Sequence, residues 1–276
     1  MKPLRISAIS YLNTAPLMWD FEHGAAGSGL DISYTIPSHC AASLRDESAD
    51  IGIIPAAAYT SIPGLVILPG VTIASRQAVR SILLVSKVPL EQIRSVALDN
   101  SSLTSVALLK VLFAKWWGGG RTFTSMQPDI DAMLKQHDAG LLIGDPALRI
   151  DRSRFLCYDL AEEWLRLTDK PFVFAFWAVR HGALQNGSEM DLAAVFQRSR
   201  DHGLLPENIE QIAREWSPRL GLSRIEIKHY VTEHIYYYLD DSCMEGLNLF
   251  FRYAAECGAL PQAPPLHFLE PKTALH

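Results

Sequence analysis

The chain has 276 residues, of which 49% are hydrophobic and 20% are charged, so it holds enough apolar side chains for one large core or two smaller ones. A net charge of −5 and a pI of about 6.0 exclude the broad basic surface on which nucleic acid or anionic lipid would collect. No apolar run approaches the ~18 residues that cross a bilayer. The first residues also lack the uninterrupted apolar segment of a signal peptide, so we expect a cytoplasmic protein.

The N-terminal third alternates short apolar runs with helical ones. Helices are predicted over residues 16–24 and 39–49, and strands over 5–10, 30–37, 50–56, 65–75 and 79–89. Strands that alternate with helices indicate βαβ units and a mainly parallel sheet.

A second cycle of the same kind follows. Its predicted helices cover residues 102–117 and 129–138, and its predicted strands cover 95–99, 121–125, 139–148, 155–160 and 172–179. Beyond about residue 188 every segment up to 260 has helical spacing, and the proline-rich tail 261–276 is predicted to be irregular. These cycles indicate two lobes, one formed by residues 1–87 and 181–276 and the other by 88–180. Ligands of such α/β folds bind in the crevice beside strand ends and helix N-termini.

The first strand ends in an unusually polar turn, "ISYLNTAP" at residues 9–16. The simplest interpretation is a helix N-cap by Asn13 or Thr14, with Pro16 in the first turn. The free N–H groups of a helix N-terminus also suit a carboxylate, so Ser10 and Tyr11 are candidates to face a ligand as well.

The stretch "LDNSSLTSVAL" at residues 98–108 repeats this design in the second half of the chain. A single cap would need one polar residue, whereas five of them precede the apolar helix here: Asn100, Ser101, Ser102, Thr104 and Ser105. Such a cluster could hold an anionic group without any formal positive charge.

Two further positions have both an ordinary and a functional interpretation. Ser81 lies inside the apolar run "VRSILL", where a buried serine is usually bonded to backbone. The corner Gly144–Asp145–Pro146 is an ordinary turn, yet Gly144 would permit close approach of a ligand. The cysteines are far apart and form no Cys/His cluster, so we expect free thiols and no metal site.

Several motifs together resemble the chorismate dehydratases of the futalosine route to menaquinone. They are "ISYLNTAPL", "DIGIIPAAAY", "VRSILLVS", "VALDNSSLTSVALLKVLF", "LLIGDPAL" and "PFVFAFWAVR", in order over residues 5–180. One departure is the lack of a glycine near Gln77. The resemblance implies a two-lobed α/β fold of the type II periplasmic-binding-protein kind, with a cleft between the lobes and a helical C-terminal segment. It also implies dehydration of chorismate to 3-[(1-carboxyvinyl)oxy]benzoate without metal or organic cofactor.

The same resemblance implies the site residues. It makes Asn13 and Ser81 the catalytic pair. The substrate-binding residues it implies are Ser10, Tyr11, Thr14, Pro55, Ser102, Thr104, Ser105, Gly144 and Asp145. The expected partner is the small-molecule substrate alone, and the oligomeric state is not predicted.

Two alternatives stay open. One is a sister enzyme with the same lobes, which releases 1,4-dihydroxy-6-naphthoate from a cyclised futalosine and whose pattern has a Pro-Asn-Asp type motif and a histidine. The other is a solute-binding protein for a small carboxylate, because binding without catalysis is the usual role of this fold.

Overall fold

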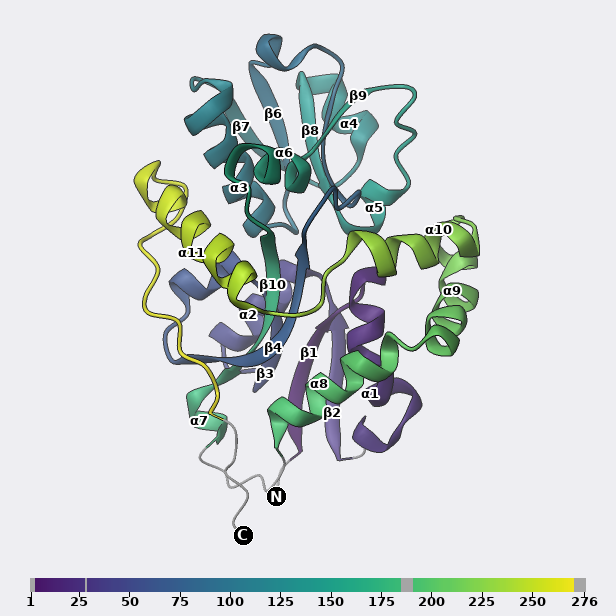
Figure 1. Cartoon of the computed structure of the whole chain (residues 1–276). Coiled ribbons are helices and arrows are strands. Elements are labelled where there is room, and N and C mark those ends of the chain that lie inside the picture. The colour runs from purple at the N-terminus through teal and green to yellow at the C-terminus, as the bar shows by residue number, and fades with distance from the viewer. Residues whose placement is uncertain (1–2, 28, 185–190, 271–276) are drawn as a thin grey trace.

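Two five-stranded sheets, each flanked by helices, lie at opposite ends of the computed structural model, which describes residues 3–27, 29–184 and 191–270 (Figure 1). The strands are β1 (Leu4–Ile9), β2 (Leu30–Thr35), β3 (Ile51–Pro55), β4 (Leu65–Ser75), β5 (Ile82–Ser86), β6 (Ser95–Asp99), β7 (Thr122–Met126), β8 (Ala139–Ile143), β9 (Leu156–Asp159) and β10 (Phe172–Arg180). The main helices are α1 (Trp19–His23), α2 (Pro37–Arg45), α3 (Thr104–Leu112), α4 (Ile130–Gln136), α5 (Gly144–Leu148), α6 (Leu160–Thr168), α7 (His181–Leu184), α8 (Leu192–Gly203), α9 (Pro206–Leu220), α10 (Arg224–His229) and α11 (Asp241–Glu256).

Shorter helical segments join these elements. They are η1 (Leu12–Met18), η2 (Ala25–Gly27), η3 (Ala56–Ser61), η4 (Leu90–Gln92), and the π-helical turns η5 (Phe113–Trp117) and η6 (Tyr230–His234). We call the first sheet with its packed helices the first lobe, and the second sheet with its helices the second lobe.

The two sheets share one design. The strand orders are β2-β1-β3-β10-β4 and β7-β6-β8-β5-β9. In each sheet, the chain enters the fourth strand of this order directly after it has crossed from the other lobe. That strand, β10 or β5, is antiparallel to both its neighbours, while the other pairs are parallel. The sheets are therefore mixed: four strands of each run in one direction, as the predicted mainly parallel sheet requires, but the fifth is inserted antiparallel between two of them.

The predicted lobe boundaries are shifted at both crossings. Strand β5 was assigned to the lobe of residues 1–87 but pairs in the second sheet, and β10 was assigned to 88–180 but pairs in the first. Every residue of β5 and nearly every residue of β10 is buried. A continuous apolar run predicts a buried strand but not the sheet that it joins, which explains the shift. Residues 1–2, 28, 185–190 and 271–276 of the predicted first lobe lie outside the described residues.

Three local predictions are wrong. The predicted strand over 139–148 ends at Ile143, and Gly144–Leu148 forms α5 because Pro146 suits a first helical turn. Helix α6 was not predicted, although Asp159 caps it by accepting from the N–H groups of Ala161 and Glu162.

The third wrong prediction concerns the aromatic stretch "IYYYL" at 235–239, which is extended rather than helical. Ile235 and Tyr237 are buried while Tyr238 is exposed, which is the alternation of a strand. Backbone bonds join Tyr236 to Ala74, and the tail adds a bridge from Phe268 to Ile67. Both segments therefore cover the outer edge of β4, which would otherwise be an open sheet edge.

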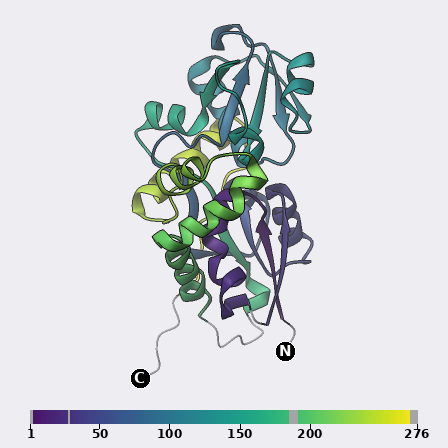
Figure 2. The same cartoon turned by 90° about the vertical axis from the view of Figure 1, so that its right-hand side faces the viewer.

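The C-terminal helices pack mainly on the first lobe. α8 and α9 contact η1 of that lobe, and Figure 2 shows this C-terminal green segment in front of the first lobe and reaching the level where the lobes meet. α11 contacts both β10 and α3, so it joins the two lobes on one side. Within the described ranges no helix is both long and apolar enough to cross a membrane. All the cysteines are unpaired, as predicted; Cys40 and Cys243 are buried, and Cys157 and Cys257 are half-buried.

Candidate active site

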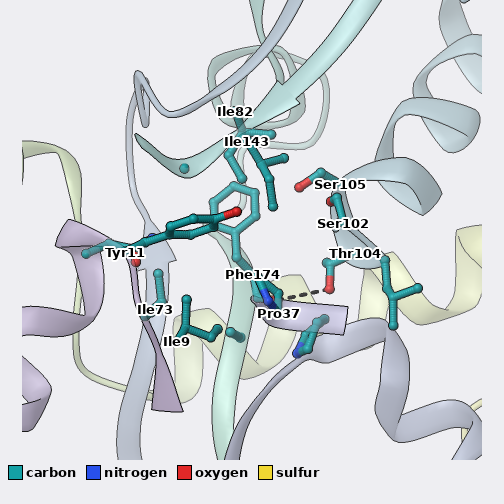
Figure 3. Close-up of a pocket in the computed structure, with 15 residues that line it drawn as sticks. Ile9, Tyr11, Pro37, Ile73, Ile82, Ser102, Thr104, Ser105, Ile143 and Phe174 are labelled. Carbon is teal, nitrogen blue, oxygen red and sulfur yellow. Dashed lines mark hydrogen bonds between the residues drawn. The ribbon is translucent and has the colours of Figure 1, made fainter. Parts of the chain in front are cut away.

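A hollow that is partly open to solvent lies between the two lobes (Figure 3), with an empty space of about 430 Å³ when the open solvent at its mouth is included. The first lobe contributes Ile9, Tyr11, Asn13, Pro37, Pro55, Ile73, Phe174 and Ala175, and the second contributes Ile82, Ser102, Leu103, Thr104, Ser105, Ile143 and Gly144. The two polar turns that the sequence singled out therefore meet at one cavity. None of these lining residues is Lys, Arg, His, Asp or Glu, so the polar groups at the hollow carry no formal charge.

The first turn does not form the predicted side-chain cap. Tyr11 is the N-cap of η1 and makes no capping bond, while the Asn13 amide oxygen accepts from the Thr14 hydroxyl at 3.3 Å. Asn13 lines the hollow, Thr14 is buried away from it, and the exposed Ser10 bonds to the Thr35 carbonyl. Ser10 and Thr14 thus lie outside the lining, contrary to the prediction.

The second turn presents hydroxyl groups at the start of α3. Its N-cap, Leu103, offers no side-chain bond. Ser102 and Ser105 line the hollow, and their hydroxyl groups have no hydrogen-bond partner in the described part of the chain. Thr104 differs, because its hydroxyl accepts from the Ala57 N–H at 3.1 Å and donates to the Phe174 carbonyl at 3.0 Å. Thr104 therefore ties the second lobe to the first, and its hydroxyl is already engaged.

A second tie runs through Tyr11. Its hydroxyl lies 3.5 Å from Ser101 Oγ, and Ser101 donates both its hydroxyl and its N–H to Asp99, at 2.6 and 2.9 Å. Asp99 also accepts from the Ile143 N–H. Burial raises the pKa of both Tyr11 and Asp99, and the bonds from Ser101 partly oppose the rise at Asp99.

Gly144 permits the close approach that was predicted, but the group that approaches belongs to this chain. Its φ is +60°, and a Cβ placed there would lie 2.5 Å from ring atoms of Tyr11. The next residue, Asp145, does not line the hollow; it accepts from the Leu12 N–H at 3.1 Å. Burial raises the pKa of Asp145 to about 6, although the Leu12 N–H and Arg149 oppose this. Asp145 is thus a third tie between the lobes.

Ser81 lies behind the lining rather than in it. It is 1% exposed, its hydroxyl accepts from the Tyr230 hydroxyl at 2.8 Å, and its carbonyl accepts from the Gly144 N–H. The ordinary interpretation of a serine satisfied by backbone is therefore wrong, because the partner of its hydroxyl is a side chain. The neighbouring Ile82 lines the hollow in its place.

Sequence reasoning missed the apolar part of the site and Tyr230. The hydrophobic lining comes from strand ends and from β10, where Phe174 and Ala175 lie inside a long apolar run that gave no separate signal. Tyr230 lies in the C-terminal segment, far from Ser81 in the sequence, so no local motif could indicate their contact. Over residues 3–27, 29–184 and 191–270, no group of three or more His, Cys, Asp and Glu is placed to hold a metal ion.

Comparison with known proteins identifies the family. The sequence profile of a family described as menaquinone biosynthesis matches residues 4–256. The chain belongs to this family. This menaquinone-biosynthesis protein is 29% identical to a chorismate dehydratase of Thermus thermophilus, over 96% of the chain and 98% of the relative. The predicted resemblance to chorismate dehydratases is thereby confirmed.

Solved structures agree on the fold of this menaquinone-biosynthesis protein. Protein AF1704 of Archaeoglobus fulgidus superposes with a TM-score of 0.71 at 19% identity, covering 94% of this chain and 99% of that one. The periplasmic aliphatic sulphonate binding protein SsuA of Escherichia coli gives 0.62 at 16% identity, covering 100% and 96%. A Candida albicans protein described as having the generic periplasmic binding protein fold gives 0.67 at 12% identity, with each chain fully covered. The predicted two-lobed, periplasmic-binding-protein-like fold is confirmed.

Proposed function

We propose that this protein is a chorismate dehydratase, a cytoplasmic lyase that converts chorismate to 3-[(1-carboxyvinyl)oxy]benzoate for menaquinone biosynthesis. The observation that carries the proposal is the hollow between the lobes, where two uncharged polar turns face one another across an apolar wall. Chorismate is a cyclic acid with two carboxylates, so it needs donors at both ends and an apolar surface for its ring. The family match and the Thermus thermophilus relative support the same substrate.

The reaction needs little acid–base power from the protein. The C3 proton leaves, its bonding electrons form the C3–C4 double bond, and the C4 hydroxyl departs as hydroxide, so the net loss is one water molecule. The ring becomes aromatic, which supplies the driving force. The enzyme then contributes mainly orientation and electrostatic stabilisation. The enolpyruvyl carboxylate of the substrate can reach the C3 proton and serves as its acceptor.

Asn13 and Ser81 are assigned as the catalytic pair from the resemblance. The Asn13 amide faces the hollow and can stabilise charge where the proton leaves, and Ser81 lies behind the adjoining wall beside Ile82. We assign the Ser102 and Ser105 hydroxyls and the first N–H groups of α3 to one carboxylate. We assign the Tyr11 hydroxyl and the η1 turn to the second carboxylate.

A direct assay tests the proposal. The purified protein is incubated with chorismate, and the formation of an aromatic product is followed by ultraviolet absorbance and identified by NMR. Asn13→Asp and Ser81→Ala should each lower turnover by about 10²-fold or more. Ser10→Ala is the matched control for serine removal, because Ser10 is exposed and outside the hollow. Unchanged turnover in both site variants would remove the assignment, and activity that survives dialysis against a chelator would support the absence of a metal cofactor.

The solute-binding alternative is favoured by one observation, the likeness in fold to the sulphonate-binding protein. Chorismate that binds, as seen by calorimetry, but is recovered unchanged would establish that alternative. The sister enzyme is expected to use a histidine, and no histidine is among the lining residues of the hollow. Conversion of a cyclised futalosine instead of chorismate would nevertheless identify the sister activity.

A further inference from the structure

A buried pair of tyrosines lies behind the hollow and has no role in the function described so far. Tyr230 and Tyr237 are each 2% exposed and come from the C-terminal segment. The Tyr230 hydroxyl donates to Ser81 Oγ at 2.8 Å. The Tyr237 hydroxyl, equally buried, has no hydrogen-bond partner among the described residues.

The surrounding backbone fixes Tyr230 in place. Tyr230 opens the π-helical turn η6, which packs against η1, the segment that carries Asn13. The chain then pairs with β4 through Tyr236 and Ala74. π-helical turns are rare and are found frequently at functional sites. The turn therefore holds the Tyr230 hydroxyl beside Ser81, the residue directly before β5, where the chain passes from the first lobe to the second.

We propose that Tyr230 is a positioning residue of the dehydratase, which orients the Ser81 hydroxyl through their hydrogen bond. The inference rests on the proposed function of the site. A serine hydroxyl has one proton to donate. Because Ser81 accepts from Tyr230, its own proton stays available for the Asn13 side chain or for the substrate. Hydrogen bonds in a chain polarise one another, so the bond from Tyr230 also makes Ser81 a stronger donor.

The electrostatic surroundings agree with this geometry. Burial, the largest of the effects that act on it, raises the pKa of the Tyr230 phenol. The tyrosine thus stays protonated at neutral pH and keeps the proton that it donates. Asp145 and Asp159, the charged groups that act on Tyr230, favour the same protonated form.

Tyr230→Phe in the full-length protein tests the inference, with Tyr237→Phe as the matched control. Both variants keep the ring that fills the core, but only the first removes a hydrogen bond. We expect Tyr230→Phe to lower kcat about 10-fold, the size of one neutral hydrogen bond, with KM within about twofold of the wild-type value. Tyr237→Phe should stay within about twofold in both constants. If Tyr230 had a purely structural role, Tyr230→Phe would lower the midpoint of urea unfolding but would not lower kcat while leaving KM unchanged.

The double variant Ser81→Ala/Tyr230→Phe separates the explanations. If Tyr230 acts through Ser81, its removal has little further effect once Ser81 is alanine. Additive losses, a fully active Tyr230→Phe protein, or a Tyr230→Phe protein that does not fold would each overturn the inference. Failure of the wild-type protein to convert chorismate would instead refute the proposed function itself, so the two failures are distinct.

Discussion

Replacing Gly144 by alanine should disturb the site through a single added methyl group. The φ of +60° costs a non-glycine residue about 1–2 kcal/mol. The new Cβ would also lie 2.5 Å from the Tyr11 ring, far inside van der Waals contact, and such overpacking costs about 1–3 kcal/mol. Together these lower the free energy of unfolding by about 2–5 kcal/mol, which a domain of ordinary stability survives. The methyl group would push Tyr11 away from its place in the hollow, and a displacement of this size lowers kcat/KM for chorismate about 10²-fold.

Two companion variants divide the loss into its causes. Gly64 has a φ of +71° with no atom within 4 Å of an added Cβ, and it lies outside the hollow. Gly64→Ala therefore measures the backbone cost alone, by urea unfolding, and should leave chorismate turnover unchanged. Adding Tyr11→Ala to Gly144→Ala removes the clash, so the double variant should lose less stability than the sum of the two single changes.

Equal stability losses in Gly144→Ala and Gly64→Ala would contradict this prediction, because the Tyr11 contact would then cost nothing. The prediction also fails if Gly144→Ala keeps the wild-type kcat/KM, which would mean that the Tyr11 ring can move without consequence for the reaction. Strict additivity in the double variant would contradict the contact as well.

Two more predictions follow from the ties between the lobes. The pKa of Asp145 is about 6 in the folded protein, above the 3.8 of the unfolded chain. Burying the ionised carboxylate therefore lowers the free energy of unfolding; this loss is absent below pH 3.8, grows as the pH rises toward 6 and is complete above 6. Asp145→Asn, which keeps an oxygen for the Leu12 N–H, should therefore be more stable than wild type in urea at pH 8 and equally stable near pH 4; a constant difference at all pH values would contradict the pKa shift. Thr104→Val should cost about 1–3 kcal/mol, because it leaves the Ala57 N–H and a β10 carbonyl without their partner. Ser102→Ala should leave stability unchanged and raise KM for chorismate, and equal stability losses in the two variants would argue against the tie.

The sequence was enough to predict most elements and the two-lobed class, because hydrophobic runs and their punctuation are local. The predicted lobe boundaries were shifted because pairing is not local. The runs of β5 and β10 look like any buried strand, and only the sheet shows that each crosses to the other lobe. The stretch 235–239 was mistaken for helix because its residues are all aromatic or aliphatic, so the alternation of buried and exposed positions was hidden.

In the candidate site, too, local features could be predicted from the sequence, whereas contacts between distant residues could not. Asn13, Ser102 and Ser105 were found because surplus polar residues at a strand end are visible in a short window, and the structure places them at one hollow. Thr104 belongs to the second of these turns and Asp145 to the corner at Gly144–Pro146, but their side chains bond across the lobes, which no window of sequence shows. Residue type indicated a polar site, whereas the partner of each group needed the fold.

The ties also bear on how a substrate enters a hollow that is only partly open to solvent. On one side of the molecule α11 packs against both β10 and α3, so the lobes stay joined there. On the side of the polar turns they are held by several hydrogen bonds: Leu12 to Asp145, Tyr11 with Ser101, Ser38 to Ser101, and the two bonds of the Thr104 hydroxyl. Each such bond contributes only about 0.5–1.5 kcal/mol net, so the bonds together are comparable to the binding free energy of a small ligand. If the proposed function holds, we expect the lobes to part at these turns when the ring acid enters, and the residues that hold the turns together are the ones that keep Asn13, Ser102 and Ser105 at one hollow.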